Sequence, residues 1–279
     1  MNPLTFSTLA CPSWSIKTIV TKAAQYGYGG IEWRGGLQGH VQPTITPTEK
    51  SLLRKLCSDA GLTSLAVTAY TSFVSDSAGE RQSNIDELRR YADLAEELGA
   101  QYIRTFLGEL PEGVNLDSAI YDQISDCLNV VLEHAESMGI TIAVEPHDNF
   151  VRSSTILPIL RRVQHSALRV IWDVGNTFAV GEEPAESFAL LNAHLAYIHV
   201  KDGKGRLPNW QLCLLGQGDV PLNQIFESLL ANNYLGAFSV EWEYAWHPEL
   251  EPPEIALPAA FRTVKKLLEI GRASCRERV

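Results

Sequence analysis

The sequence predicts an α/β protein built as a single (β/α)8 barrel of the TIM type, and three observations carry this prediction. Eight short apolar runs rich in β-branched residues alternate with longer stretches of helical period, as repeated βα units require. Several helical stretches end in a glycine directly before the next run. No Pro/Ser-rich linker divides the chain, and 279 residues, 45% of them hydrophobic, suffice for one large core.

The eight apolar runs are the expected strands, each bounded by a turn or by Gly and Asn punctuation. In chain order they are Leu4–Ala10, Gly30–Arg34, Leu62–Ala69, Tyr102–Leu107, Ile140–Glu145, Arg169–Asp173, Ala196–Val200 and Phe238–Glu241. Between the runs, apolar residues recur at i, i+3, i+4 and i+7, which predicts outer helices. Examples are Ile85, Leu88, Ala92, Ala95 and Leu98, followed by Ile124, Leu128, Val131, Leu132 and Ala135. The glycines expected to end helices in a left-handed cap are Gly27, Gly61, Gly99 and Gly139.

The barrel domain is expected to span residues 1–270, with its last helix in the amphipathic stretch Phe261–Ile270. Residues 271–279 read Gly-Arg-Ala-Ser-Cys-Arg-Glu-Arg-Val, which is charged and without periodicity. We therefore expect a disordered tail outside the fold. The segment resembles translated cloning or adapter sequence, so it is excluded from functional reasoning.

Charge and cysteine content disfavour several classes of protein. The 23 lysines and arginines against 33 aspartates and glutamates give a formal charge of −10 without a basic run, which disfavours nucleic-acid binding. The five cysteines are scattered and form no C-x-x-C pair, which argues against a disulfide framework or a zinc knuckle. Residues 1–14 do not resemble a signal peptide, and no 18 consecutive residues are apolar. We expect a cytoplasmic protein that does not enter the membrane.

Polar residues end four consecutive apolar runs, where the active site of such a barrel is built. The runs read Ile-Ala-Val-Glu145, Val-Ile-Trp-Asp173, Tyr-Ile-His199 and Ser-Val-Glu241. Three carboxylates cannot converge in an apolar interior without a cation, because each loses hydration that a partner charge must replace. Three oxygens and one imidazole suit a single divalent ion, with Mn²⁺ as the first expectation and Mg²⁺, Co²⁺ or Zn²⁺ as alternatives. For each residue singly, a salt bridge or a helix cap is the alternative.

These strand ends, in their order along the chain, resemble the sugar phosphate isomerase/epimerase superfamily of xylose isomerase-like barrels. Further shared motifs are Gly-Gly-Ile-Glu32-Trp at the second run and Leu-Gly216-Gln-Gly218-Asp-Val-Pro after the seventh. The resemblance covers about residues 4–270 and implies that Glu145, Asp173, His199 and Glu241 ligate the metal. In the ketose 3-epimerase branch it further implies that Glu145 and Glu241 move the proton. A metal that chelates a carbonyl and the neighbouring hydroxyl would stabilise an enediolate. Two bases on opposite faces of the substrate could then invert the configuration of the carbon, since one removes its proton and the other returns a proton from the opposite side.

The chain departs from epimerase relatives three residues after the sixth-strand aspartate, where Asn176 stands in place of a common histidine. An amide can bind substrate by hydrogen bonds but cannot take up a proton near neutral pH. His147 and Lys201 are alternative acid/base groups, as in a dehydratase that eliminates water next to a carbonyl. A loop position for His147 and a surface ion pair with Asp202 for Lys201 remain open.

Glu32 and Arg104 lie toward the ends of the second and fourth runs, where they are expected to bind substrate or to pair with each other. Trp33, beside Glu32, is a further expected substrate contact, because an indole can cover the apolar face of a sugar ring. The same role is open for Trp14, Trp172 and Trp242, with packing in the core or at the rim as the alternative.

The resemblance implies a small carbohydrate substrate and three functions to distinguish. The first is a metal-dependent isomerase or epimerase of a keto-sugar or polyol. The second is a dehydratase or other lyase acting on an inositol-derived or sugar ketone at the same metal. The third is a barrel that binds a metabolite without turnover. A nuclease of the endonuclease IV type is disfavoured by the acidic charge and by the presence of only seven histidines. A homo-oligomer is expected from the general frequency of such assemblies.

Overall fold

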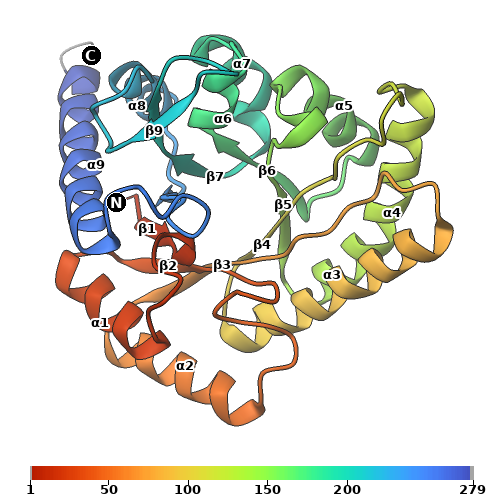
Figure 1. Ribbon diagram of the computed structural model, residues 1–279, viewed down its shortest axis with the longest axis horizontal. Coiled ribbons are helices and arrows are strands. Elements are labelled where there is room, and N and C mark those ends of the chain that lie inside the picture. The colour runs from red at the N-terminus through yellow and green to blue at the C-terminus, as the bar shows by residue number, and fades with distance from the viewer. Residues whose placement is uncertain (1, 277–279) are drawn as a thin grey trace.

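Within residues 2–276, which the computed structural model describes, eight parallel strands close into a barrel surrounded by helices (Figure 1). The strands are β1 (Leu4–Ser7), β2 (Gly30–Trp33), β3 (Thr63–Thr68), β4 (Tyr102–Thr105), β5 (Thr141–Val144), β6 (Leu168–Asp173), β7 (Leu195–Val200) and β10 (Phe238–Val240). Their order around the barrel follows the chain, and β10 closes it against β1. The predicted (β/α)8 barrel is confirmed. Six strands lie inside their predicted apolar runs, and β6 and β7 begin one residue before theirs.

The helices follow the strands and form the outer layer (Figure 1). They are α1 (Ile16–Tyr26), α2 (Pro47–Asp59), α3 (Ala78–Leu98), α4 (Ser118–Ser137), α5 (Ser153–Val163), α6 (Val174–Ala179), α7 (Pro184–Leu191), α8 (Leu222–Ala231) and α9 (Pro253–Arg276). The predicted glycine caps are present at Gly27 and Gly99, both of which have the left-handed φ that a β-carbon would penalise. No helix in this part of the chain is long and apolar enough to cross a membrane.

The last helix does not stop at the predicted boundary, Ile270. α9 continues to Arg276, with Gly271 buried against α8 and Arg272 donating a hydrogen bond to the Asn2 side chain. Residues 277–279 lie outside the described residues. That the segment from residue 271 onward is added sequence stays a prediction.

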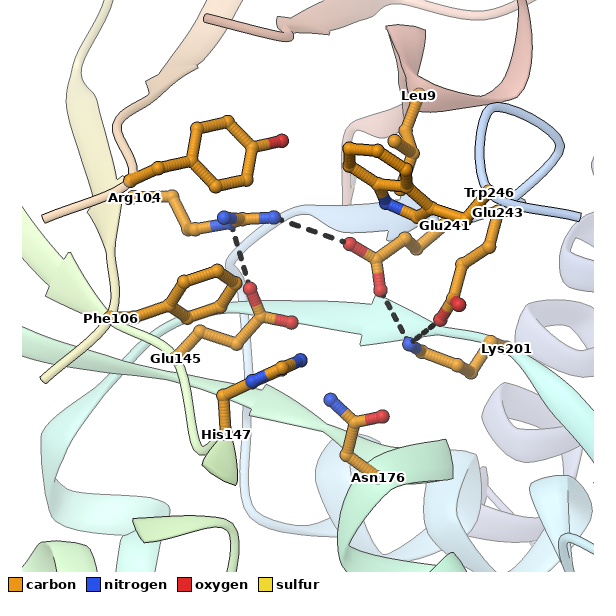
Figure 2. A pocket seen from close by; sticks show the side chains of 11 residues that line it. Leu9, Arg104, Phe106, Glu145, His147, Asn176, Lys201, Glu241, Glu243 and Trp246 are labelled. Atoms are coloured by element: carbon orange, nitrogen blue, oxygen red, sulfur yellow. Dashed lines mark hydrogen bonds and ion pairs between the residues drawn. The ribbon is translucent and has the colours of Figure 1, made fainter. Parts of the chain in front are cut away.

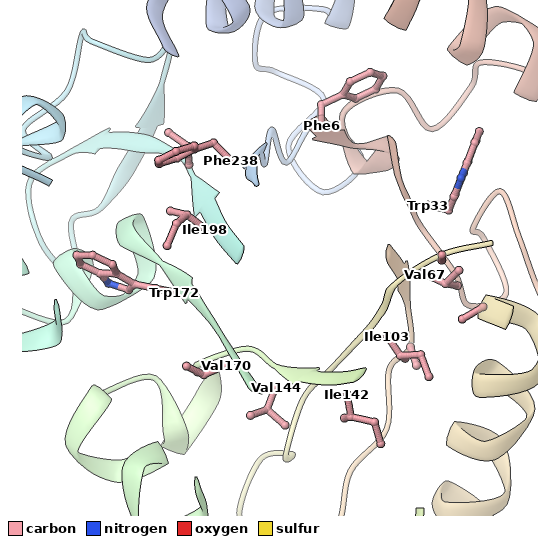
Figure 3. Close-up of a cluster of buried hydrophobic side chains, with 14 of the residues drawn as sticks. Phe6, Trp33, Val67, Ile103, Ile142, Val144, Val170, Trp172, Ile198 and Phe238 are labelled. Carbon is pink, nitrogen blue, oxygen red and sulfur yellow. The ribbon is translucent and has the colours of Figure 1, made fainter. Parts of the chain in front are cut away.

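Successive side chains of a strand point to opposite sides of the barrel wall, so the strands contribute to two separate buried regions. Outward-facing side chains such as Ile103, Ile142 and Val144 pack toward the helices in the main hydrophobic core (Figure 3). A smaller apolar cluster includes Ala66, Ala143, Ile171 and Tyr197. Four strands contribute to it, and Tyr102 of β4 packs against it. Buried polar side chains follow where the strands end, so the carboxyl end of the barrel carries the chemistry.

An antiparallel hairpin, which the sequence analysis did not predict, follows β7. It consists of β8 (Asp202–Lys204) and β9 (Gln211–Cys213), each too short to show a period. The hairpin leads to the Gly216-Gln-Gly218 turn, which wraps the carboxylate of Asp202. That carboxylate accepts hydrogen bonds from the backbone N–H groups of Gly203, Gly216, Gly218 and Val220. Asp202 directly follows Lys201, so this nest of N–H groups fixes the chain where β7 leaves the barrel.

Candidate active site and metal centre

The four predicted metal ligands meet at the carboxyl end of the barrel. Glu145 follows β5, Asp173 ends β6, His199 lies in β7 and Glu241 follows β10. Each offers one ligand atom, all of these atoms lie within 4.8 Å of one another, and all four residues are buried. Strand register explains part of this proximity, because Asp173 of β6 is paired with His199 of the neighbouring strand β7. The structure therefore brings together residues that are up to 96 positions apart in sequence, from Glu145 to Glu241.

His199 is held so that one ring nitrogen points into the cluster. Its Nε2 lies 2.9 Å from Glu32, while its Nδ1 lies 3.1 Å from Glu145 and 3.4 Å from Glu241. Glu32 also accepts hydrogen bonds from Ser239 Oγ at 2.7 Å and Tyr197 Oη at 3.2 Å. A carboxylate on Nε2–H leaves the Nδ1 lone pair free for a metal, which is the usual arrangement of a histidine ligand.

This geometry corrects the substrate-binding expectation for Glu32. Its side chain is fully buried beneath His199 and does not line the pocket described below. It also does not pair directly with Arg104, whose carboxylate neighbours are Glu145 and Glu241. The structure places Glu32 as a positioning residue for the imidazole.

Negative charge exceeds positive charge in the cluster. Five carboxylates surround two permanent cations, which leaves three negative charges before His199 is counted. The carboxylates belong to Glu32, Glu145, Asp173, Glu241 and Glu243, and the cations to Arg104 and Lys201. Burial alone would lower the pKa of His199, but the carboxylates, Glu32 foremost, raise it well above its ordinary value. Burial raises the pKa of Asp173 to about 7, because Lys201 only partly offsets the loss of water.

Two buried oxygens in the cluster lack a hydrogen bond. Asp173 Oδ2 and Glu145 Oε2 accept none, although Lys201 Nζ lies 3.0 Å from the first and Arg104 Nε 2.8 Å from the second. Buried carboxylate oxygens without aligned donors are costly unless a cation binds them. The donor set, its negative excess and these two oxygens all fit a divalent metal ion.

A pocket of about 260 Å³ opens above the cluster (Figure 2). It brings together the predicted site residues Arg104, Glu145, His147, Asn176, Lys201 and Glu241. Leu9, Tyr70, Phe106, Glu243 and Trp246 complete its lining. These five were not predicted. Leu9 and Phe106 fall within predicted apolar runs but lie beyond the ends of β1 and β4, and the other three stand in loops, where no periodicity marks a position that faces the site.

Arg104 and Lys201 neutralise the two glutamates from opposite sides of the pocket (Figure 2). The Arg104 guanidinium packs against the rings of Tyr70 and Phe106, at 5.1 Å and 4.2 Å from their centroids. Lys201 Nζ lies 2.6 Å from Glu241 and 2.5 Å from Glu243. A surface ion pair between Lys201 and Asp202, the open alternative, is wrong, because Lys201 is buried among the cluster carboxylates.

His147 and Asn176 stand on the far side of Glu145 from Arg104 (Figure 2). His147 Nδ1 lies 2.8 Å from Asp148, and its ring lies 4.3 Å from that of Phe106, with 45% of the side chain exposed. Asn176 donates its backbone N–H to Asp173, and its side-chain amide reaches the carbonyl of Pro146 at 3.4 Å. Both side chains can therefore meet a ligand that enters from the mouth.

Trp33 does not contact the pocket, contrary to expectation. It follows Glu32 on β2, so alternation turns it outward, where it is fully buried and donates a hydrogen bond to Ser64. Trp172 and Trp242 are likewise buried, with their indole N–H groups bonded to Thr177 and to the Glu251 carbonyl. Trp14 is partly buried against the core. The indole at the pocket is instead that of Trp246.

Comparison with known proteins agrees with this architecture. The chain is 25% identical over 194 residues to 3-oxo-isoapionate decarboxylase of Pectobacterium atrosepticum, covering 67% of this chain and 64% of that protein. It is 22% identical over 200 residues to 3-dehydroshikimate dehydratase of Pseudomonas putida, covering 68% of this chain and 31% of that protein. The chain thus spans less than two thirds of the length of these curated relatives.

The crystal structure of a D-tagatose 3-epimerase-like protein superposes with a TM-score of 0.82 at 20% identity, covering 98% of this chain and 99% of that one. At this identity the likeness shows the shared fold alone. The sequence model of one family matches residues 20–267, which include all four residues of the cluster. The protein belongs to the xylose isomerase-like TIM barrel family.

Proposed function

We propose that the protein is a metal-dependent enzyme that removes the proton next to the carbonyl of a small polyhydroxylated ketone, acting as an isomerase or epimerase. The observation that carries the proposal is the position of Glu145 and Glu241. Both belong to the metal-sized cluster, and both line the pocket above it. They reach it from β5 and β10, strands separated in the barrel by β6 and β7.

Glu145, Asp173, His199 and Glu241 would hold the divalent cation, which supplies the Lewis acidity that makes the hydrogen next to the substrate carbonyl acidic. One glutamate can take that proton, and the other can return one on the opposite face. Arg104 and Lys201, both donors in the pocket, can bind substrate oxygens and stabilise negative charge on them. That the metal is Mn²⁺ stays a prediction.

A dehydratase is the second candidate, and a separate observation favours it. His147 and Lys201 line the same pocket as the two glutamates, so an acid is available for a departing hydroxyl group. Asn176, which also lines the pocket, cannot serve as that acid. The decarboxylase and dehydratase among the relatives support a lyase on this platform, because loss of CO₂ next to a carbonyl and removal of a proton there both leave an enolate that the same cation could stabilise.

Metal content tests the cluster. Protein reconstituted with Mn²⁺ and gel-filtered should retain about one metal ion per chain, and Glu145→Gln and His199→Ala should lose it. Glu182→Gln is the matched control, because Glu182 is also buried and accepts hydrogen bonds, but from Ser153 and Ser187 between α5 and α7. Retention in the two cluster variants would contradict the proposed ligands.

The reaction is then tested with keto-sugars and inositol-derived ketones in D₂O. Metal-dependent deuterium incorporation next to the carbonyl would support the proposal. Inversion of the configuration at that carbon would identify an epimerase, and movement of the carbonyl group to that carbon would identify an isomerase. Loss of one water, seen by mass, would instead establish the dehydratase. Metal binding without exchange or turnover of any ketone would favour a barrel that only binds its ligand.

A further inference from the structure

A second cavity, of about 520 Å³, adjoins the pocket above the metal cluster. The two share His147, Asn176 and Glu243 in their linings, so a ligand can extend from one into the other. Trp210 and Leu212, from the β8–β9 hairpin region, line one part of the second cavity, and His247 and Leu250, before α9, line another.

The size of the two cavities limits what the site can hold. The pocket above the metal cluster, about 260 Å³, lies below the roughly 300–1,000 Å³ usual for small-molecule sites. The second cavity is twice as large and carries none of the four cluster residues. A substrate that fills both therefore has a reacting part and a second, larger part that takes no share in the chemistry.

The lining of the second cavity favours an uncharged ligand group. Neither lysine nor arginine occurs among the described residues that line it, whereas Glu243 and Glu249 do. His247 lies between these two carboxylates, 3.8 Å from the first and 3.2 Å from the second. An anionic group would meet repulsion there without a permanent cation to bind it. Hydroxyl groups, in contrast, can donate to the carboxylates and exchange hydrogen bonds with the Gln211 and Asn176 amides.

Trp210 adds a fixed apolar surface to this polar lining. Its ring packs against Phe178 at 6.1 Å between centroids. It also lies so close to Gly203 that a β-carbon there would stand 2.5 Å from the indole. An indole held in this way gives the C–H face of a sugar ring an apolar contact at little entropic cost, and Leu212 and Leu250 extend it.

We propose that the second cavity is a subsite for an uncharged glycosyl group attached to the ketone that reacts above the metal cluster. The protein then prefers a glycosylated ketose to a free monosaccharide. This inference rests on the proposed function for the identity of the reacting part, and on the second cavity alone for the glycosyl group.

Binding of ketoses that share one keto unit tests the subsite. Calorimetry on the Mn²⁺-loaded protein would compare D-fructose with turanose, lactulose and isomaltulose, in which fructose carries a glycosyl group at different oxygens. At least one disaccharide should bind about tenfold more tightly than D-fructose. Trp210→Ala should remove that advantage and leave D-fructose binding unchanged. Trp14→Ala, at a partly buried indole outside both cavities, is the matched control and should change neither.

Leu250→Trp is a second variant, which fills the cavity without removing packing and should abolish the advantage in the same way. The inference fails if no disaccharide binds more tightly than D-fructose, or if the advantage survives both Trp210→Ala and Leu250→Trp. Deuterium exchange separates this failure from that of the proposed function. Exchange in free ketoses without a glycosyl preference overturns only the subsite, whereas glycosyl-dependent binding without exchange in any ketose overturns only the reaction.

Discussion

Glu32→Gln is expected to weaken Mn²⁺ binding about ten- to hundredfold, the range typical for a carboxylate that orients a metal-bound histidine. Glutamine keeps one oxygen, so His199 Nε2 and one of the two hydroxyls, Ser239 Oγ and Tyr197 Oη, can still donate to it. It loses the negative charge 2.9 Å from the imidazole and turns one acceptor into a donor. The loss corresponds to about 1.4–2.8 kcal/mol of metal-binding free energy, at about 1.4 kcal/mol for each factor of ten.

The dissociation constant of Mn²⁺, followed by electron paramagnetic resonance of the free ion, measures this effect. Glu182→Gln makes the same chemical change at another buried, hydrogen-bonded glutamate and should leave the constant unchanged. Circular dichroism shows whether both variants fold. Unchanged affinity in Glu32→Gln, or an equal loss in both variants, would refute the role given to Glu32.

Three further changes have expected outcomes. Each carboxylate oxygen of Asp202 accepts two backbone N–H groups, and Asp202→Asn turns one of these oxygens into an NH₂ donor. The free energy of unfolding, measured in urea, should fall by about 3 kcal/mol. An unfolding free energy equal to that of the wild type would contradict the role of these N–H groups. Lys201→Met should tighten Mn²⁺ binding, because the ammonium competes for Asp173 and Glu241; weaker binding would count against that competition. Burial first, and then Arg34, lowers the pKa of His40, so its neutral form stabilises the fold above pH 6.5 and this contribution is lost as the pH falls below that value. His40→Gln should therefore flatten the loss of stability on acidification, and urea midpoints that fall as steeply as in the wild type would contradict this.

The barrel could be predicted because the strands fall on short apolar runs and the long helices α3 and α4 carry a 3.6-residue period. The convergence of Glu145, Asp173, His199 and Glu241 could be predicted because the runs end at the same edge of the barrel, so that the last polar residues of neighbouring runs lie close together in space. Asp173 and His199 illustrate this, since strand register places them side by side. The resemblance to a known family strengthened the expectation that they bind a metal, which strand ends alone do not specify.

Glu32 and Trp33 show where the reasoning from sequence went wrong. Adjacent residues of a strand face opposite sides, so both could not meet the same substrate, and alternation alone would have excluded one of them. For Glu32, the sequence does not show how deep the side chain lies in the barrel. Its side chain points inward like those of the four predicted ligands but lies beneath His199, as its hydrogen bonds with His199, Ser239 and Tyr197 show.

The pocket walls could not be predicted for a different reason. Tyr70, Phe106, Trp210 and Trp246 belong to connections after strands, where the backbone path sets which side chain faces the site. Such segments have no period to read, and their side chains meet only after the barrel closes. The sequence therefore predicts the fold better than it predicts the substrate.

The cluster is organised in two levels that do different things. Below, Glu32 is bonded to Ser239 and Tyr197, which fixes the imidazole of His199 whatever the pocket contains. Above, Arg104 and Lys201 hold Glu145 and Glu241 with ion pairs that a divalent cation would displace. Cation binding would thus free two donors at the place where substrate oxygens arrive. In the proposed function, the rigid level would set the geometry of the metal ligands, and the exchangeable level would couple metal binding to substrate binding. This coupling would account for the burial of cations and carboxylates together at this end of the barrel.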